Sequence, residues 1–410
     1  MELVENWTEI LDEDDGIDVA YLDFRKAFDL VSHRHLAYKM AKYGITKQVL
    51  DWVKAFLSQR TQKVVIRGTP SESCDVTSGV PQGSVLGPIL FLIFINDLPL
   101  EVISPLSLFA DDSKIYTRIF GEKSKIRRVN CGEEILQKDL DSIKNWAVKW
   151  KMEFNVDKCK VMHLGSGNPR HTYTMGGEDL AETTEEKDLG VIFDEKLEFS
   201  KHIKVMVGKA NRMLGMIRRG FTCLDREIFK LLYPVLVRPL LEYCVQVWSP
   251  NKQMDIDLIE KVQKRAVKMV PGMKDLSYEE RLVKLGLTKL VERRFRGDMI
   301  ETYKLLTNKE GISRNIFFEL RPDERGDPEA NRGLIIFKKR TTGRKRRKYT
   351  FSQRVVNPWN KLLKEEVQAK TTSNFKAKFD ANEVKRRRDR RNLGGNRFLF
   401  QRLYIVGGMV

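Results

Sequence analysis

The chain has 410 residues, with 74 lysines and arginines against 56 aspartates and glutamates, so its formal net charge is +18. This length allows about two or three domains, and the basic excess indicates a polyanionic partner such as nucleic acid. We expect no membrane contact, because the longest apolar run, residues 89–95, is too short to cross a bilayer. The five cysteines have no paired spacing, which favours a reducing, intracellular location in the nucleus or the cytoplasm.

The first predicted element is a buried strand. An apolar run over residues 17–22 predicts this strand, which would deliver Asp23 to the edge of a sheet. Two helices are expected next, with Ser32 and Thr46 as their N-caps and with ends near Gly44 and Ser58.

A loop rich in glycine and proline follows two expected strands, over residues 62–66 and 73–77. The loop, residues 78–88, contains three glycines and two prolines, which oppose regular structure and let the backbone approach a ligand closely. Pro88 then begins a predicted apolar helix that continues through Ile95.

Two adjacent acids, Asp111 and Asp112, are flanked on both sides by apolar or β-forming residues, so we expect them at the tip of a tight hairpin. Their carboxylates repel each other unless a cation joins them. Such a pair alone is more often a solvated turn. Asp23 lies far earlier in the sequence, and only the fold can bring it to this hairpin.

Helical spacing of apolar residues over residues 133–151 predicts a helix that covers the back of the sheet. The order of elements up to this point favours an α+β fold in which helices back an antiparallel sheet. From about Lys201 the pattern becomes one of long amphipathic helices. In the helix expected over residues 256–270, the interspersed lysines and arginines are consistent with a solvated surface or with a surface that grips phosphates.

Basic residues are concentrated in two runs near the C-terminus. Eight of eleven residues are basic over 338–348, and six of seven over 385–391. Such runs bind phosphates, address a protein to the nucleus, or form a solvated, partly disordered tail. Residues 321–328 and 392–396 have the composition of linkers.

Three motifs occur in a fixed order: YLDFRKAFD at residues 21–29, GVPQGSVLGP at residues 79–88 and FADD at residues 109–112. In this order they resemble the palm motifs of reverse transcriptases, and most closely those of jockey-type retrotransposons without long terminal repeats. The resemblance continues through LGV at residues 189–191, LYPVLVRPLLEY at residues 232–243 and FSQRVVNPWN at residues 351–360. It therefore extends over most of the chain.

The resemblance implies a palm over residues 1–195, a helical thumb and post-palm region over 196–310, and a basic, partly disordered region over 311–410. It implies RNA-directed DNA polymerase activity on an RNA template with a DNA primer and deoxynucleoside triphosphates. The metal ligands of the family match Asp23, Asp111 and Asp112, which would hold two Mg²⁺ ions, or Mn²⁺, for phosphoryl transfer.

Further roles follow from matched positions. By resemblance, the residues near the nucleotide are Phe24, Phe28, Gln82, Gly83 and Lys158. Phe28 would exclude a ribose 2′-hydroxyl, and Lys158 of the NVDK motif would neutralise the leaving pyrophosphate. The backbone at Leu189 and Gly190 would form the primer grip. We interpret Asp29 as a cap for the helix entry near Ser32.

The chain departs from the family upstream of Asp23, where only 22 residues precede that acid. Neither the fingers motifs nor an endonuclease is visible, which favours an N-terminally truncated portion of a larger polyprotein. One alternative is a catalytically inactive nucleic-acid-binding remnant of such a polymerase. Another is an RNA-synthesising polymerase, against which Phe28 argues.

Overall fold

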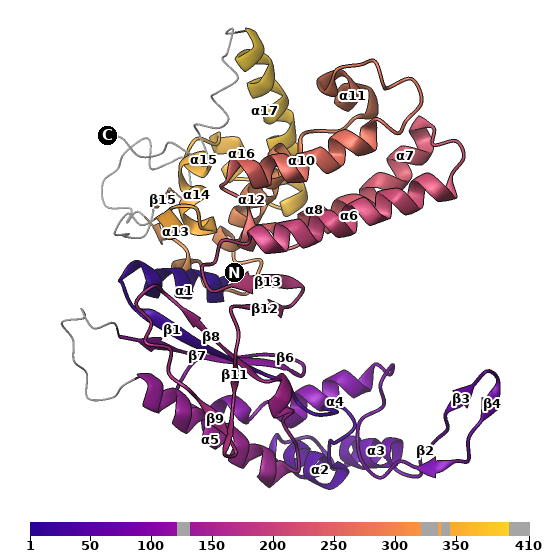
Figure 1. Cartoon of the computed structure of the whole chain (residues 1–410), viewed down its shortest axis with the longest axis vertical. Coiled ribbons are helices and arrows are strands. Elements are labelled where there is room, and N and C mark those ends of the chain that lie inside the picture. Colours follow the sequence, from indigo (N-terminus) through magenta and orange to yellow (C-terminus); the bar gives the residue numbers. More distant parts are fainter. Residues whose placement is uncertain (121–131, 321–334, 338–344, 393–410) are drawn as a thin grey trace. The chain divides into compact units, whose positions relative to one another are not determined.

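The computed structural model describes residues 1–120, 132–320, 335–337 and 345–392. They form a mixed α and β structure that divides into two compact units (Figure 1). We call Asp14–Glu186 the sheet unit, and Met1–Glu13 together with Lys187–Val410 the helical unit. The division expected from the sequence was 1–195, 196–310 and 311–410, whereas here residues 1–13 group with the C-terminal part.

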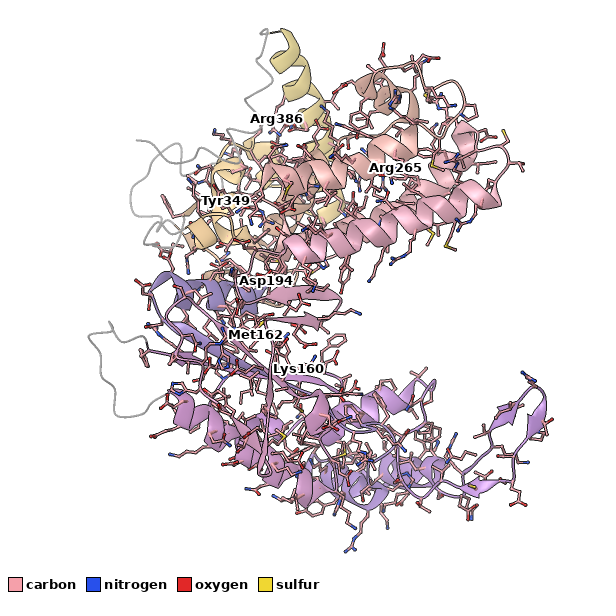
Figure 2. The ribbon with its side chains drawn as sticks, in the orientation of Figure 1. Lys160, Met162, Asp194, Arg265, Tyr349 and Arg386 are labelled. Carbon is pink, nitrogen blue, oxygen red and sulfur yellow. The ribbon has the colours of Figure 1, made fainter. Side chains whose placement is uncertain are left out.

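A five-stranded sheet forms the centre of the sheet unit, with the strand order β11-β8-β1-β7-β6. Its strands are β1 (Gly16–Leu22), β6 (Leu106–Phe109), β7 (Asp112–Ile119), β8 (Lys160–Leu164) and β11 (Ala181–Glu182). The expected strand β1 is antiparallel to both β7 and β8. It lies at the centre of the sheet, and its side chains Ile17, Val19, Ala20 and Leu22 are buried. Met162 of β8, labelled in Figure 2, is also fully buried.

The helices of the sheet unit begin close to their predicted positions. They are α2 (His33–Lys42), α3 (Lys47–Leu57), α4 (Leu86–Ile95) and α5 (Gly132–Trp150). The Ser32 side chain caps α2 by accepting a hydrogen bond from the His35 amide at 3.4 Å. Helix α4 begins two residues before the expected Pro88, and Ser84 Oγ accepts a hydrogen bond from the amide of Gly87 in its first turn at 2.9 Å.

The two expected strands before the glycine loop form an exposed ribbon of short pieces. These are β2 (Thr61–Gln62), β3 (Val65–Ile66), β4 (Thr69–Pro70) and β5 (Cys74–Asp75). Strand β2 pairs with β5, and β3 pairs with β4. Gly68, with φ +86°, makes the turn of the ribbon.

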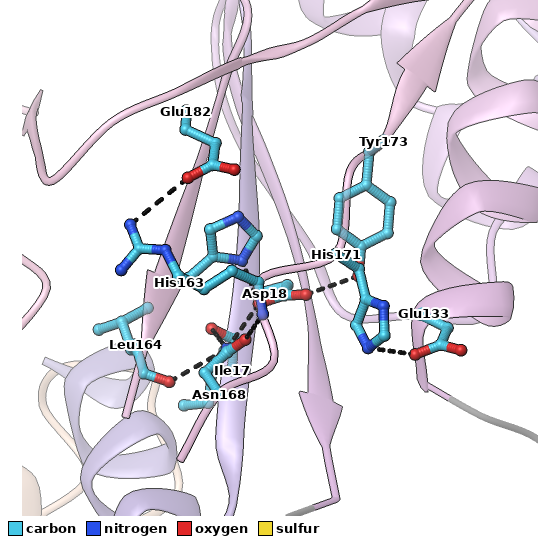
Figure 3. A network of polar contacts seen from close by, with 10 residues as sticks. Ile17, Asp18, Glu133, His163, Leu164, Asn168, His171, Tyr173 and Glu182 are labelled. Atoms are coloured by element: carbon cyan, nitrogen blue, oxygen red, sulfur yellow. Dashed lines mark hydrogen bonds and ion pairs between the residues drawn. The ribbon is translucent and has the colours of Figure 1, made fainter. Parts of the chain in front are cut away.

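A buried acid fixes β1 to the segment that follows β8 (Figure 3). Asp18 is fully buried and accepts hydrogen bonds from His163 Nδ1 at 2.6 Å, Tyr173 Oη at 2.6 Å and Asn168 Nδ2 at 2.7 Å. Burial, followed by the charge of Asp18, raises the pKa of Tyr173, so its hydroxyl remains a donor. These donors offset the cost of removing the carboxylate from water.

The helical unit confirms the expected change to long helices. Its main helices are α6 (Ser200–Gly220), α7 (Arg226–Leu232), α8 (Arg238–Glu242), α10 (Gln253–Val267), α11 (Tyr278–Leu285), α12 (Leu290–Leu306) and α17 (Thr372–Asn392). Shorter helices α9 (Val245–Trp248), α13 (Lys345–Lys348), α14 (Phe351–Arg354), α15 (Val356–Asn360) and α16 (Lys364–Val367) complete it. Helix α10 packs against α6, α11 and α12.

The first helix of the chain, α1 (Glu2–Asp12), belongs to this unit because of two sets of contacts. Trp7 is fully buried and packs edge-on against Phe193 of β13 (Val191–Asp194). Glu5 accepts a hydrogen bond from Ser352 Oγ at 2.6 Å and lies 3.6 Å from Arg347. Residues that precede the sheet unit in sequence are therefore part of the helical core.

The second basic run, residues 385–391, lies within helix α17. Most of the first run, residues 338–344, lies outside the described residues, and so do the two predicted linkers, except for Asn392. Arg347, a member of the first run, is an exception. Its side chain is 1% exposed, and it lies 3.6 Å from both Glu5 and Glu9. The side chain of this arginine is therefore not available to phosphates in the structure. In the described part of the chain, no helix has the length and apolar character needed to cross a membrane.

Candidate active site

Asp23 and the FADD hairpin lie at the same end of neighbouring strands. Strands β1 and β7 pair up to Leu22 opposite Ser113, and Asp23 is the next residue of its strand. On the other side, Phe109 pairs with Asp112 across the turn of the β6–β7 hairpin. Continuation of this register sets Asp23 opposite Asp112, one residue from the hairpin tip.

The turn itself holds Asp111 at the tip. Ala110 and Asp111 are its two central residues, and Ala110 has φ +52°. A left-handed conformation costs a residue with a side chain about 1 kcal/mol, and strain of this kind is common at functional sites. Asp111 is half-buried, whereas Asp112 is exposed.

The backbone of Asp23 is held by the segment that precedes β8. The Asn155 amide donates to Asp23 O at 2.8 Å, and the Asp23 amide donates to Cys159 Sγ at 3.4 Å. Burial raises the pKa of the Cys159 thiol, so the group beside the acid remains neutral. Lys158 Nζ lies 3.3 Å from Asp23 Oδ2.

The acids have the donor chemistry that hard cations require, since carboxylate oxygens are the preferred ligands of Mg²⁺ and Mn²⁺. Asp23 Oδ2 is shielded from solvent and accepts no hydrogen bond from the described residues. Within the described ranges, no three His, Cys, Asp or Glu side chains are close enough to form a cage for a metal ion. The fit to a divalent cation therefore rests on the type of ligand, since a cation bound through one or two carboxylates completes its shell with water.

The glycine loop packs against the segment that follows Asp23. The Val80 amide donates to Phe28 O, and the Gly79 amide donates to Val31 O, both at 2.8 Å. Gly79 has φ +91°, and a Cβ atom added there would lie 2.8 Å from Asp29 O. Only glycine allows this approach.

The interpretation of Asp29 as a helix cap is wrong. Ser32 caps α2, and Asp29 Oδ1 instead accepts a hydrogen bond from Gln82 Nε2 at 3.1 Å. The motif spacing gave no indication of this contact, because the two residues belong to different motifs. Asp29 therefore orients the side chain of the loop residue that the resemblance assigns to the nucleotide.

Residues 13–200 match the family model described as reverse transcriptase (RNA-dependent DNA polymerase). This segment is a reverse transcriptase domain. The three motifs at residues 21–29, 79–88 and 109–112 therefore lie within a reverse transcriptase domain, as their order predicted.

The names of curated relatives agree with this match to the reverse transcriptase family. The RNA-directed DNA polymerase from mobile element jockey of Drosophila funebris is 29% identical over 295 residues, which are 68% of this chain and 31% of that protein. The polymerase of the same name from Drosophila melanogaster is 29% identical over 287 residues, 65% of this chain and 30% of that protein. A probable RNA-directed DNA polymerase from transposon BS of Drosophila melanogaster is 25% identical over 291 residues, 65% of this chain and 30% of that protein. The chain thus spans just under a third of the length of these relatives.

The aromatic residues of the first motif differ in exposure within the reverse transcriptase domain. Phe24 is 4% exposed and stacks on Phe154 with a ring separation of 4.2 Å. Its side chain is part of the core, so it cannot contact a substrate as the motif position suggested. Phe28 is half-buried and stacks on Phe91 at 4.6 Å, which leaves part of its ring accessible.

The remaining expected residues lie in exposed turns. Gln82 and Gly83 are exposed, and Gly83 has φ +81° with open space around it. Leu189 and Gly190 connect β12 (Glu185–Asp188) to β13 and both have positive φ. Tyr243 Oη donates to Leu189 O at 3.0 Å, so this turn is braced within the helical unit.

Sequence reasoning did not identify three residues that support the site of the reverse transcriptase domain. Asn155 and Cys159 hold the backbone of Asp23, and His33 Nε2 lies 2.7 Å from Gly79 O. Asn155 and Cys159 could have been suspected from their places within and beside the NVDK motif. His33 carries no such signal, since it is only the first residue of a predicted helix.

Proposed function

We propose that this chain is the polymerase portion of a retrotransposon protein and that it synthesises DNA on an RNA template. The observation that carries the proposal is the register of β1, β6 and β7, which brings Asp23 to the same sheet edge as Asp111 and Asp112. The reverse transcriptase model and the jockey relatives support it.

The three acids would bind the divalent cations, Mg²⁺ or Mn²⁺, that the family uses. When bound, two such cations activate the primer 3′-hydroxyl and stabilise the oxygens of the leaving pyrophosphate. Of the three acids, Asp23 is the best positioned to bind a cation, because hydrogen bonds with Asn155 and Cys159 fix its backbone. The hairpin would hold Asp111 at the tip and Asp112 beside it.

The nucleotide would lie between these acids and the glycine loop. Gln82, oriented by Asp29, and the open backbone at Gly83 would contact the incoming triphosphate. Phe28 would limit the space beside its sugar, and Lys158 would neutralise charge on its phosphates. The deoxynucleotide preference follows from Phe28, because a ribose requires room for its 2′-hydroxyl.

The helical unit would contribute a thumb that holds the primer and template. Helix α6 carries six exposed basic residues and no acidic residue; these are Lys201, Lys204, Lys209, Arg212, Arg218 and Arg219. Contacts with phosphates position a duplex without reading its sequence. Leu189 and Gly190 would place the primer end through their backbone.

A second candidate function is nucleic-acid binding without catalysis. The charge of +18 and the basic face of α6 would persist in a remnant that no longer held a triphosphate. Both functions require nucleic-acid binding whose affinity falls steeply as the salt concentration rises, because phosphates release counterions when lysine and arginine neutralise them.

Primer extension distinguishes the two candidates. The chain is incubated with primed RNA, deoxynucleoside triphosphates and Mg²⁺ or Mn²⁺, in parallel with Asp111→Asn, and binding of the primer and template is measured for both proteins. We expect extension by the unaltered chain, at least a hundredfold less by the variant, and equal binding. Salt-dependent binding without any extension would instead support the inactive remnant.

A further inference from the structure

Lys158 occupies the position next to Asp23 that a metal ion would need. Its Nζ atom lies 3.3 Å from Asp23 Oδ2, a carboxylate oxygen that is itself shielded from solvent. No described residue donates a hydrogen bond to this oxygen. The ammonium group is therefore the cation that the structure places beside Oδ2.

We propose that Lys158 is an exchangeable counter-ion: it balances Asp23 in the metal-free protein, and an arriving divalent cation displaces it. The inference rests on the proposed function, because it takes Asp23 to be a metal ligand. Two cations within about 3 Å of one oxygen would repel each other strongly. Binding of the divalent cation at Oδ2 and the contact with Lys158 therefore exclude each other.

The local structure lets the side chain leave while the backbone stays in place. The Lys158 side chain is 66% exposed, and it projects from a single helical turn, Val156–Lys158. That turn is anchored at both ends, because the Asn155 amide donates to Asp23 O at 2.8 Å and the Cys159 amide donates to Asn155 O at 3.1 Å. Displacement requires only rotation of an exposed lysine side chain.

The exchange would link metal binding to substrate binding. In the metal-free state the ammonium group is held by the carboxylate, and after the cation binds it is released into the same neighbourhood, where it can pair with a triphosphate. Coupling of this kind is reciprocal, so removing the ammonium group must strengthen metal binding. Ion pairs between exposed groups are weak, and the expected effect is accordingly modest.

Metal binding is measured directly by titrating the full chain with Mn²⁺ and following free Mn²⁺ by electron paramagnetic resonance. Lys158→Met should lower the dissociation constant of the Asp23 site about threefold, the size expected for loss of an exposed pair. Lys158→Arg, which keeps the charge, should remain close to the unaltered chain. Lys160→Met is the matched control, because it removes the same charge from a neighbouring lysine that pairs with Glu186 at 3.0 Å.

Asp23→Asn identifies the site and separates the two possible failures. If it leaves Mn²⁺ binding unchanged, Asp23 is not a metal ligand, and the site assignment in the proposed function fails. Asp23→Asn can instead weaken Mn²⁺ binding while the Lys158→Met variant binds Mn²⁺ no more tightly than the Lys160→Met variant. That result would overturn the exchange alone and leave Asp23 as a metal ligand.

A second measurement uses the unaltered chain and does not depend on the folding of a variant. Acetylation of Lys158 by limiting acetic anhydride is quantified by mass spectrometry with and without Mn²⁺. Mn²⁺ should release the Lys158 ammonium group from Asp23 and so raise the acetylation of Lys158 about twofold relative to that of Lys160. An unchanged ratio at saturating Mn²⁺ would contradict the displacement.

Discussion

Gln82 donates a hydrogen bond to Asp29, with Nε2 3.1 Å from Oδ1, and so joins the glycine loop to the segment that carries Asp23. Ser78 Oγ also donates to the backbone oxygen of Asp29 at 2.9 Å. One residue thus receives hydrogen bonds from both the first and the central part of the loop. This contact sets the direction of the Gln82 amide.

Asp29→Ala should weaken nucleotide binding without affecting metal binding. Loss of a hydrogen bond to a charged group at an exposed site predicts a KM for the triphosphate about 3- to 10-fold higher. Steady-state extension assays measure the KM, and the Mn²⁺ titration measures the dissociation constant of the metal. A change in the metal constant alone would show that Asp29 acts through the acids instead.

Gly79→Ala should destabilise the sheet unit by about 2–4 kcal/mol, because it adds a clash with Asp29 O to a left-handed conformation. Gly83→Ala is the matched control. Gly83 also has positive φ but no atoms within 4 Å of the added carbon, so its cost should be about 1 kcal/mol. Hydrogen exchange of peptides from the sheet unit, measured in increasing urea, gives both values. Equal costs would mean that the loop shifts to accommodate the methyl group.

Phe28→Val should increase the use of ribonucleotides relative to deoxyribonucleotides, since it opens space beside the sugar. The measurement is the ratio of the two kcat/KM values in primer extension. Because Phe28 also stacks on Phe91, the variant should lose about 1 kcal/mol of stability. If both activities fall together and the ratio stays constant, Phe28 has only a packing role.

The stability of the helical unit should decrease as the pH falls below about 6.5. Burial, and then the charge of Lys209, lower the pKa of His202 to about 4, and its Nδ1 accepts a hydrogen bond from the Ile192 amide at 3.2 Å. The unfolded chain therefore binds the proton more tightly, and about 3 kcal/mol is lost between pH 6.5 and pH 4. Hydrogen exchange of α6 peptides across this range should show the loss, and His202→Gln should reduce it. If the His202→Gln variant and the unaltered chain showed the same pH dependence, the loss of stability would come from other titratable groups.

Trp7→Ala should destabilise the helical unit by about 3–5 kcal/mol, because it removes a fully buried ring that contacts Phe193. Glu2→Ala changes an exposed residue of the same helix and serves as the control. Hydrogen exchange should increase in α6 and β13 only for the tryptophan variant. Loss of protection confined to α1 would indicate that this helix is dispensable for the unit.

Local patterns in the sequence determined much of the candidate site. The order of the three motifs identified the reverse transcriptase domain, and apolar spacing placed α5 within one residue of its observed bounds. The Ser32 cap and the acidic hairpin were predicted because both depend on neighbouring residues.

Only the tertiary structure decided which distant residues meet. The contacts of Asp29 with Gln82, of Asp23 with Cys159 and of Trp7 with Phe193 join segments far apart in the sequence. Periodicity and turn propensity describe neighbours along the chain, so they carry no signal for such pairs. Composition likewise assigned Arg347 to a basic run that binds phosphates, addresses the protein to the nucleus or forms a solvated tail, whereas the structure buries it beside Glu5 and Glu9. Only the fold brings these two carboxylates within 3.6 Å of the buried arginine, because they lie more than 300 residues away in the sequence.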